Sequence, residues 1–331
     1  MASDRGEQKA QALWYTAPGR AEIRDEIVPA PAEGEVRVRA LFGALSRGTE
    51  ALVSHARVPA SEYERMRAPF MGGHFPFPVK YGYANVGRVE AGPAALLGRT
   101  VFALYPHQSL YVLPAEAVVP LPQDVPAKRA VLAANMETAL NAVWDGEPGP
   151  APRIAVVGAG VVGALVAWLC GRLPGANVTM IDIDPARAAL AQILGVGFAA
   201  PGDAAGDCSL VFHASATAAG LNTALSLAGD EASVIELSWY GQGEVPVRLG
   251  EAFHARRLKL VSSQVGRVAP SHRATWTHRQ RLEAALALLA EPALDALLAP
   301  PIPFAQLPAR LPDILSPGSG ILCQPIDYSA A

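Results

Sequence analysis

The feature that most constrains this chain is a glycine-rich turn between an apolar strand and a helix. Residues 153–163, RIAVVGAGVVG, carry the pattern G-x-G-x-x-G at Gly158, Gly160 and Gly163. Asp182 stands 24 residues after Gly158, at the end of the next predicted strand. A strand, this turn, a helix and a second strand ending in an acidic residue together predict a Rossmann dinucleotide-binding unit.

Each glycine in this pattern has its own predicted role. Gly158 allows the tight turn, Gly160 lets a pyrophosphate approach the backbone, and Gly163 lets the helix lie close to the strand. The backbone around the helix N-terminus offers N–H groups and the positive end of the helix dipole to the phosphates. We therefore expect the pyrophosphate to bind along the loop and the first helical turn, at Gly158, Ala159, Gly160, Val161, Val162 and Gly163.

Asp182 determines the predicted choice of cofactor. Its carboxylate can accept hydrogen bonds from the adenosine ribose hydroxyls and would repel a 2′-phosphate, which favours NAD(H) over NADP(H). Arg187 lies close enough in sequence to leave NADP(H) open as the less favoured alternative.

The pattern of predicted strands and helices changes twice along the chain. Short alternating strands separated by Gly and Pro predict a β-rich first part, then strands alternate with helices as in a parallel sheet, and a helical segment follows from about Val268. The predicted strands are 35–41, 86–91, 100–104, 110–113, 154–157, 178–183, 210–213, 233–237, 258–262 and 320–325, and the predicted helices are 161–173, 185–194, 278–290 and 305–315. The fold class is therefore α/β, a doubly wound parallel sheet in residues 150–267 joined to a β-rich domain in residues 1–149.

Composition excludes several classes of function. Lys and Arg number 27 against 30 Asp and Glu, a net charge of −3, so nothing favours nucleic acid or anionic membranes as partners. Cys170, Cys208 and Cys323 form no CxxC pair, which excludes a disulfide framework and a cysteine-rich zinc lobe. The polar N-terminus lacks the apolar run of a signal peptide, so we expect a soluble, cytoplasmic protein.

The order of these parts resembles the medium-chain dehydrogenase/reductase superfamily, the relatives of zinc alcohol dehydrogenase. Residues 78–92, PVKYGYANVGRVEAG, are similar to the family segment P-x-x-x-G-H-E-x-x-G-x-V, and Leu282–Leu298 with Pro303 and Phe304 is similar to its late helix and return strand. The resemblance implies a GroES-like catalytic domain, residues 1–149, to which residues 268–331 return, with the active site in the cleft between domains. It also implies a homodimer that pairs through the last strand of the parallel sheet, residues 258–262. The segment SRGTE at residues 46–50 further resembles bacteriochlorophyllide dehydrogenase.

The departures from the zinc members are as informative as the resemblance. Ser46 stands where they have the ligand Cys, Tyr83 and Ala84 replace His-Glu, and Ala134 stands near the third ligand. A serine hydroxyl and a phenol are poor zinc ligands and alanine is none, so we expect no zinc. Glu137 would be a ligand alone.

Without zinc, hydrogen-bond donors have to stabilise a developing oxyanion. By position in the family pattern, the candidate catalytic residues are Tyr83, Tyr105, Ser46 and Thr49, with His107 as a further acid or base. Tyr83 could instead only fill the empty metal pocket, Glu50 could form a salt bridge with Arg47, and Lys80 is expected to be solvated.

Further cofactor contacts follow from the same resemblance and from the strand ends of the Rossmann unit. Thr138 matches a position that packs against the nicotinamide, and Arg47 could meet the pyrophosphate. The other expected cofactor-binding residues are Ser215, Leu237 and Ser238, whereas His213 and His272 have no partner nearby in sequence and remain unassigned.

The sequence thus predicts a zinc-independent, NAD(H)-dependent oxidoreductase that transfers a hydride between nicotinamide and a small-molecule alcohol or carbonyl. Loss of zinc keeps open an NAD(P)H-dependent reductase of C=C bonds in quinones or enones. An intact cofactor loop beside a lost metal site also keeps open a non-catalytic NAD(P)H-binding protein.

Overall fold

The computed structural model describes residues 6–331, which divide into two compact units. One unit contains the residues up to Ala134 together with Leu286–Ala331, and the other is Asn135–Ala285. Residues 1–5, part of the polar N-terminus on which the expected absence of a signal peptide rests, lie outside the described residues.

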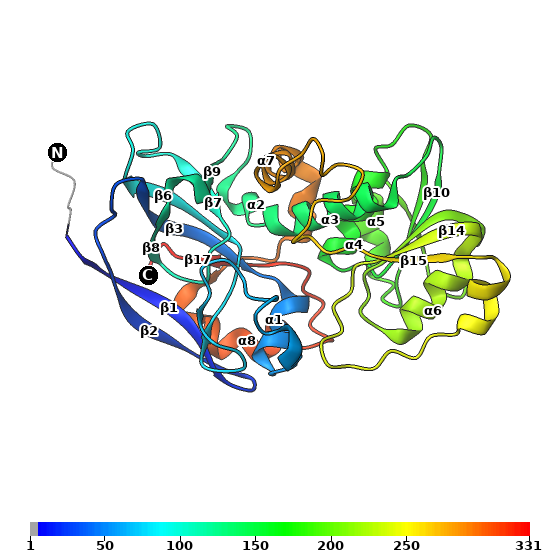
Figure 1. Cartoon of the computed structure of the whole chain (residues 1–331), viewed down its shortest axis with the longest axis horizontal. Helices are drawn as coiled ribbons and strands as arrows, with labels where there is room; N and C mark the ends of the chain where they lie inside the picture. The colour runs from blue at the N-terminus through cyan, green and yellow to red at the C-terminus, as the bar shows by residue number, and fades with distance from the viewer. Residues whose placement is uncertain (1–5) are drawn as a thin grey trace. The chain divides into compact units, whose positions relative to one another are not determined.

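The unit Asn135–Ala285 contains a parallel sheet of six strands (Figure 1). The strand order is β12-β11-β10-β13-β14-β15, the doubly wound order, so the fold class predicted from the sequence is confirmed. The strands are β10 (Arg153–Val157), β11 (Asn177–Ile181), β12 (Gly197–Ala199), β13 (Cys208–His213), β14 (Ala228–Glu236) and β15 (Lys259–Ser262).

Helices cover this sheet on both faces. The chain runs outward from β10 in one direction through β11 and in the other through β13 and β14, and right-handed crossovers therefore place the helices of the two halves on opposite faces. Accordingly α4 packs on β10 and β11 and against α5, while α6 packs on β10, β13 and β14. The helices are α3 (Ala133–Gly146), α4 (Val161–Cys170), α5 (Arg187–Leu194), α6 (Ala218–Leu227) and α7 (His278–Leu288), with an irregular turn at Leu249–Phe253.

Residues 135–149 and 268–285, which the sequence assigned to the catalytic domain, cluster with the nucleotide-binding unit instead. The physical reason is a buried ion pair, since Arg281 donates from Nε to Glu137 Oε1 over 3.0 Å. Arg281 also donates from Nη1 to the side-chain oxygen of Asn141. These contacts attach the first turns of α7 to α3.

The other unit is built on two β-sheets. One has the order β2-β1-β5-β4, and the other has the order β16-β17-β3-β6-β7-β9 with β8 paired to β3, so strands from both ends of the chain share one sheet, as in the expected GroES-like domain. The strands are β1 (Gln8–Ala17), β2 (Arg20–Val28), β3 (Glu35–Leu45), β4 (Gly72–Gly73), β5 (Val79–Lys80), β6 (Asn85–Ala91), β7 (Thr100–Ala103), β8 (Leu110–Pro114), β9 (Val118–Pro120), β16 (Ile302–Pro303) and β17 (Gln324–Asp327). The α-helices are α1 (Arg47–Ser54), α2 (Ala127–Ala130) and α8 (Leu307–Leu315), with short 3-10 turns at Ala60–Glu62, Ala115–Ala117, Pro292–Leu297 and Phe304–Gln306.

This fold contains several elements that the sequence did not predict. They are the strands β1, β2, β4, β5, β9 and β12 and the helices α1, α2, α3 and α6. The final strand is β17, Gln324–Asp327, instead of 320–325. The last strand begins later because the residues that pair with β3 start at Gln324, opposite Leu45.

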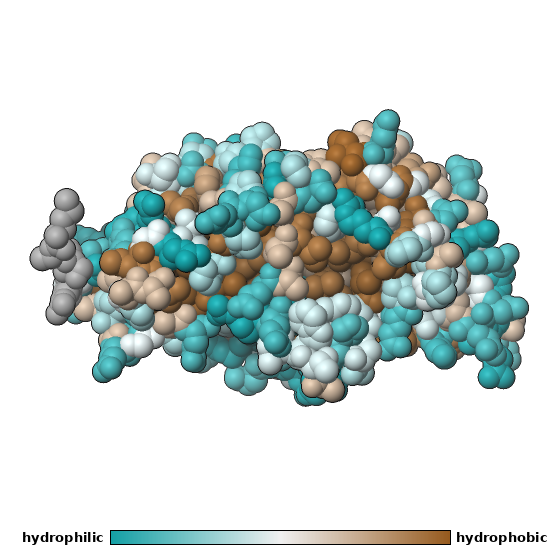
Figure 2. Space-filling view, turned by 90° about the horizontal axis from the view of Figure 1, so that it is seen from above, coloured by the Kyte–Doolittle hydropathy of each residue, from teal (hydrophilic) through white to brown (hydrophobic). Residues whose placement is uncertain are grey.

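The surface is mixed in character. Figure 2 shows, on the face seen from above, hydrophilic residues surrounding patches of hydrophobic ones. The large apolar side chains that are exposed are Ile27, Phe70, Leu97, Ile183, Ile193, Leu249, Leu260 and Val261. Among residues 6–331, no helix combines the length and the apolar character needed to cross a membrane.

Candidate functional site

The glycine loop between β10 and α4 has the geometry that its sequence predicts. Gly158 has φ +102°, a conformation that side chains disfavour, and a Cβ there would lie 2.6 Å from the backbone nitrogen of Ser215. A Cβ on Gly163 would lie 1.9 Å from the carbonyl oxygen of Gly158, so only glycine lets α4 start this close to the loop. A Cβ on Gly160 would meet no atom within 4 Å, so the chain leaves the space beside it open.

The first turn of α4 presents backbone donors at this open space. The first helical hydrogen bond runs from the N–H of Ala164 to the carbonyl of Gly160 over 2.9 Å. The N–H groups of Val161, Val162 and Gly163 therefore have no acceptor within the helix. Together with the positive end of the helix dipole, they suit a phosphate.

Asp182 lies beside the loop, directly after β11. Its Oδ2 accepts the N–H of Ala159 over 2.7 Å, and its Oδ1 accepts the N–H of Asp184 over 2.9 Å. These two bonds fix the carboxylate against the glycine loop and leave lone pairs on both oxygens for ribose hydroxyls. Arg187 Nε lies 3.3 Å from Asp184 Oδ2, so the guanidinium forms an ion pair with the Asp184 carboxylate.

The carboxyl ends of β13 and β14 bring together the remaining predicted residues of this unit. The Ala214 N–H donates to the carbonyl of Val157 over 2.8 Å, which sets Ser215 against Gly158. The Leu237 N–H donates to the carbonyl of His213 over 2.9 Å, and Ser238 Oγ accepts the Ala216 N–H over 3.1 Å. Ser215, Leu237 and Ser238 thus lie at one edge of the sheet, next to the glycine loop.

The same edge contains a hydrogen-bonded chain that the sequence did not predict. His213 Nδ1 lies 2.7 Å from Glu236 Oε2, and His213 Nε2 lies 2.6 Å from Ser215 Oγ. Glu236 also accepts the Ser238 N–H at Oε1 over 2.7 Å and the Tyr240 hydroxyl at Oε2 over 3.0 Å. Burial alone would raise the pKa of Glu236, but the hydrogen bond and charge of His213, with the Ser238 donor, hold that pKa below its ordinary value.

In the other unit, three hydroxyl groups meet at the start of α1. Tyr83 is hydrogen-bonded to the side chains of Ser46 and Thr49. Burial raises the pKa of Tyr83 to about 12, although these two hydrogen bonds act in the opposite direction. The phenol is therefore protonated at neutral pH and can donate a hydrogen bond. The structure brings Ser46, Thr49 and Tyr83 together, and their catalytic role stays a prediction.

A buried carboxylate lies beneath this cluster. Glu50 is fully buried, and its Oε1 accepts the backbone N–H of Ser46 over 2.8 Å. Its Oε2 accepts the Tyr15 hydroxyl over 2.6 Å and lies 2.8 Å from His107 Nε2. Burial, followed by the Glu50 charge and hydrogen bond, raises the pKa of Tyr15 well above its ordinary value.

Arg47, Glu50 and Lys80 take partners other than those suggested by the sequence. The Arg47 guanidinium donates to backbone carbonyls of Ile314 and Ser316, each over 2.8 Å, and to that of Ile321. Lys80 is buried, with its Nζ 2.7 Å from Glu26 Oε2 and 2.8 Å from Gln108 Oε1, so the expectation of a solvated lysine was wrong. The Glu50 carboxylate bonds the Ser46 N–H, the Tyr15 hydroxyl and the His107 ring, in place of the suggested salt bridge with Arg47.

Tyr105 and Thr138 have different surroundings. Tyr105 stacks on Tyr111 with ring centroids 4.0 Å apart and on Phe70 at 5.4 Å, and burial raises the pKa of its hydroxyl. Thr138 is half-buried on α3. Contacts of Arg47 and Thr138 with a cofactor, and of Tyr105 with a substrate, stay predictions.

The donor set at the expected zinc positions does not fit zinc. Ser46 and Tyr83 offer a hydroxyl and a protonated phenol, and Ala134 offers no ligand atom. Glu137, the remaining candidate, is paired with Arg281. Within residues 6–331, no group of three or more His, Cys, Asp or Glu side chains could hold a metal ion.

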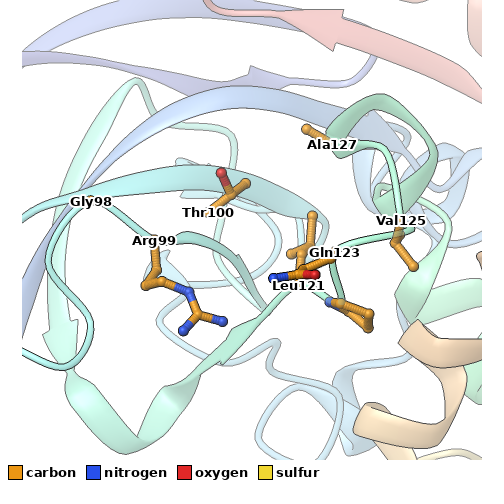
Figure 3. Close-up of a pocket in the computed structure, with 8 residues that line it drawn as sticks. Gly98, Arg99, Thr100, Leu121, Gln123, Val125 and Ala127 are labelled. Atoms are coloured by element: carbon orange, nitrogen blue, oxygen red, sulfur yellow. The ribbon is translucent and has the colours of Figure 1, made fainter.

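A separate pocket of about 500 Å³ lies in the β-rich unit, between β7, β9 and α2 (Figure 3). Its lining includes Arg99, Thr100 and Gln123 and no residue singled out by the sequence. No residue of the two clusters described above lines this pocket.

Solved structures share this architecture along nearly the whole chain. L-idonate 5-dehydrogenase from Escherichia coli superposes with a TM-score of 0.80 at 14% identity, covering 97% of this chain and 99% of that one. The chain has the medium-chain dehydrogenase fold. A putative zinc-binding dehydrogenase from Sinorhizobium meliloti bound to NADP has a TM-score of 0.77 at 16% identity, covering 97% and 100%. An alcohol dehydrogenase from E. coli CFT073 complexed with NADH has a TM-score of 0.75 at 15% identity, covering 97% and 99%. No protein-family model matches the chain.

Sequence reasoning missed two sets of polar residues. His213 ends the predicted strand 210–213 and Glu236 is the last residue but one of the predicted strand 233–237, so parallel pairing of those strands would have placed both at one edge of the sheet. The contacts of Glu50 with Tyr15 and His107 had no such signal, because β1 was not predicted.

Proposed function

We propose that this chain is a zinc-independent, NAD(H)-dependent oxidoreductase of the medium-chain dehydrogenase/reductase superfamily. It transfers a hydride between nicotinamide and a small-molecule alcohol or carbonyl. The observation that carries the proposal is the glycine loop with Asp182 fixed against it by the Ala159 N–H. The likeness to dehydrogenases that contain NADH or NADP supports a nicotinamide cofactor.

When bound, the dinucleotide would donate or accept the hydride at its nicotinamide ring. The backbone donors at the start of α4 hold the pyrophosphate, and Asp182 accepts the adenosine ribose hydroxyls. A 2′-phosphate at that place would meet the Asp182 carboxylate, which is why NAD(H) is preferred over NADP(H).

Tyr83 takes the part that a metal Lewis acid plays in the zinc enzymes. Its phenol stays protonated because burial raises its pKa to about 12, so it can donate to a developing oxyanion. Ser46 and Thr49 orient the hydroxyl through their hydrogen bonds to it. Beneath them, the Ser46 N–H is held by the buried Glu50.

We also propose a cytoplasmic homodimer. The three cysteines are unpaired and buried, as suits a reducing compartment. β15 ends the order of the six-stranded sheet, and its residues are exposed, including Leu260 at 40% and Val261 at 36%. A two-fold partner can pair the backbone groups at that edge.

The function is tested by titrating the purified protein with NADH and NADPH while following nucleotide fluorescence. A screen of NADH consumption against carbonyls, quinones and enones follows, with elemental analysis of the same sample. Tighter binding of NADH, turnover of a carbonyl and no stoichiometric zinc are expected.

Other results separate the alternatives. Turnover of only enones or quinones would assign the chain to the C=C reductases, and NADH binding with no turnover would make it a non-catalytic binding protein. One zinc per chain, lost together with activity on chelation, would contradict the assignment of Tyr83.

A further inference from the structure

The chain Glu236–His213–Ser215 lies where the two halves of the Rossmann unit meet. The adenosine half of a dinucleotide belongs to the strands on the Asp182 side, and the nicotinamide half to the strands that follow β10 on its other side. His213 and Glu236 are the last residues of β13 and β14 and are paired in register. Ser215 adjoins Gly158 of the phosphate loop.

This chain of side chains is built into the fold. His213 is fully buried, and the Glu236 side chain is 12% exposed. A Cβ on Gly220 would lie 2.0 Å from Ser215 Oγ and 2.8 Å from His213 Nε2. Only glycine at this position of α6 therefore leaves room for these two side chains. The Thr217 hydroxyl, 3.0 Å from Ser215 Oγ, extends the chain to the N-terminus of α6.

The charge of this cluster depends on one histidine. Three donors surround the Glu236 carboxylate, the His213 ring, the Ser238 N–H and the Tyr240 hydroxyl, and none of them except protonated His213 carries a positive charge. Tyr240 is the other titratable group facing His213, and burial, followed by the Glu236 charge, raises the pKa of its hydroxyl, so it stays neutral. The flanking residues of β10 and α6 are uncharged beside His213. With His213 neutral the cluster carries one negative charge, and with His213 protonated it carries none.

The two redox forms of the cofactor differ in charge at the nicotinamide ring, which is positive in NAD+ and neutral in NADH. We propose that the His213–Glu236 pair sets the preference of this site between NAD+ and NADH, favouring NAD+ when His213 is neutral and losing that preference when His213 is protonated. The inference rests on the proposed dinucleotide function and adds a pH-dependent selectivity to the same site. It makes Glu236 a positioning charge for the cofactor and gives it no part in the chemical step.

Glu231 offers a matched control on the same strand. It stands five residues before Glu236, in a bulge of β14 where its φ is +56°. The regularly paired stretch from Ser233 to Glu236 alone spans roughly 10 Å, and the Glu231 side chain is 69% exposed. Replacing either glutamate by Gln removes one negative charge, but at Glu231 that charge is separated from the cluster by more than a Debye length of about 8 Å.

The experiment measures the dissociation constant of NADH by its fluorescence and that of NAD+ by competition, from about pH 5 to pH 8, the range in which an unperturbed histidine side chain changes charge. In the wild-type chain, the ratio of the NAD+ constant to the NADH constant should fall as the pH rises. Glu236→Gln should raise this ratio about fivefold or more at the alkaline end, the lower bound of ordinary coupling between sites. His213→Asn should keep the low ratio at every pH, and Glu231→Gln should behave as wild type.

Each other result has a definite meaning. NADH binding with the same ratio in wild type and Glu236→Gln would overturn this inference and leave the proposed function standing. Failure of the wild-type chain to bind NADH would overturn the proposed function and this inference with it. If melting shows that Glu236→Gln does not fold, His213→Asn decides, because a pH dependence kept in that variant contradicts the assignment.

Discussion

Arg281 links α7 to α3, and its replacement gives a test that needs no substrate. The guanidinium is buried in a side chain only 1% exposed, where it donates to Glu137 Oε1 over 3.0 Å and to the Arg267 carbonyl over 3.2 Å. It also bonds Asn141 and the Val265 carbonyl. Arg281→Met keeps much of the apolar stem and removes every one of these donors.

The expected loss follows from what remains behind. Removing one partner of a buried pair leaves an uncompensated charge, which costs about 3–5 kcal/mol. For a unit of this size, each kcal/mol shifts the melting temperature by about 2–4 °C, so a decrease of roughly 6–20 °C is expected. Arg279→Met is the matched control on the same helix, since its pair with Glu283 is 39% and 48% exposed and should contribute about 0.3–0.5 kcal/mol.

The pH dependence has a definite sign. Burial raises the pKa of Glu137, and the charge and hydrogen bond of Arg281 act against that rise. In Arg281→Met the opposing contribution is gone, so the folded-state pKa lies further above the unfolded one. A group of this kind stabilises the fold below its pKa and loses that contribution as the pH rises. The difference in free energy of unfolding between the wild type and Arg281→Met should therefore become smaller as the pH falls from neutral.

The measurement is urea unfolding, with hydrogen exchange to locate the loss in residues 135–285. Arg281→Met combined with Glu137→Leu should recover most of the stability, because the orphaned carboxylate is then removed. Equal losses in Arg281→Met and Arg279→Met, or a deficit that widens on acidification, would refute the reasoning.

Three further predictions concern the proposed function. Tyr83→Phe should lower turnover about 10²–10³-fold, or 2.7–4 kcal/mol, with chemistry rate-limiting; the loss of its two hydrogen bonds should cost only about 1–3 kcal/mol of stability, and unchanged turnover would leave the ring as packing alone. Asp182→Ser should weaken the preference for NADH over NADPH in fluorescence titrations, and a wild-type preference for NADPH would contradict the role of the carboxylate. Leu260→Lys, on the exposed edge strand, should shift sedimentation from dimer to monomer, whereas a wild-type species near the 34.6 kDa of one chain would count against the dimer.

The nucleotide-binding unit could be predicted from sequence because its determinants are local. The apolar strand, the glycine spacing and the acidic strand end lie within residues 153–182, and each has one physical reason to be there. The structure gives Gly158 a positive φ and gives Gly163 no room for a Cβ. Such constraints leave a mark on the sequence, since no other residue type satisfies them.

Contacts between distant segments, in contrast, could not be predicted from local sequence patterns. Lys80 pairs with Glu26, 54 residues away, and Glu50 bonds Tyr15, 35 residues away. Their partners depend on sheet register, which local alternation does not specify when one end of the pairing, here β1 and β2, is not predicted. Lys80 therefore looked like a solvated lysine although it is buried.

The Glu50 cluster bears on the proposal that this chain works without zinc. A fully buried carboxylate is costly unless its oxygens are matched by donors or by a cation. Here the chain itself provides the match, with the Ser46 N–H on Oε1 and both the Tyr15 hydroxyl and His107 on Oε2. The buried Glu50 carboxylate, directly after Thr49, therefore needs no bound ion to be stable. The Tyr83 hydroxyl is in turn hydrogen-bonded to the side chains of Ser46 and Thr49, which supports the proposal that this site works through protonated donors.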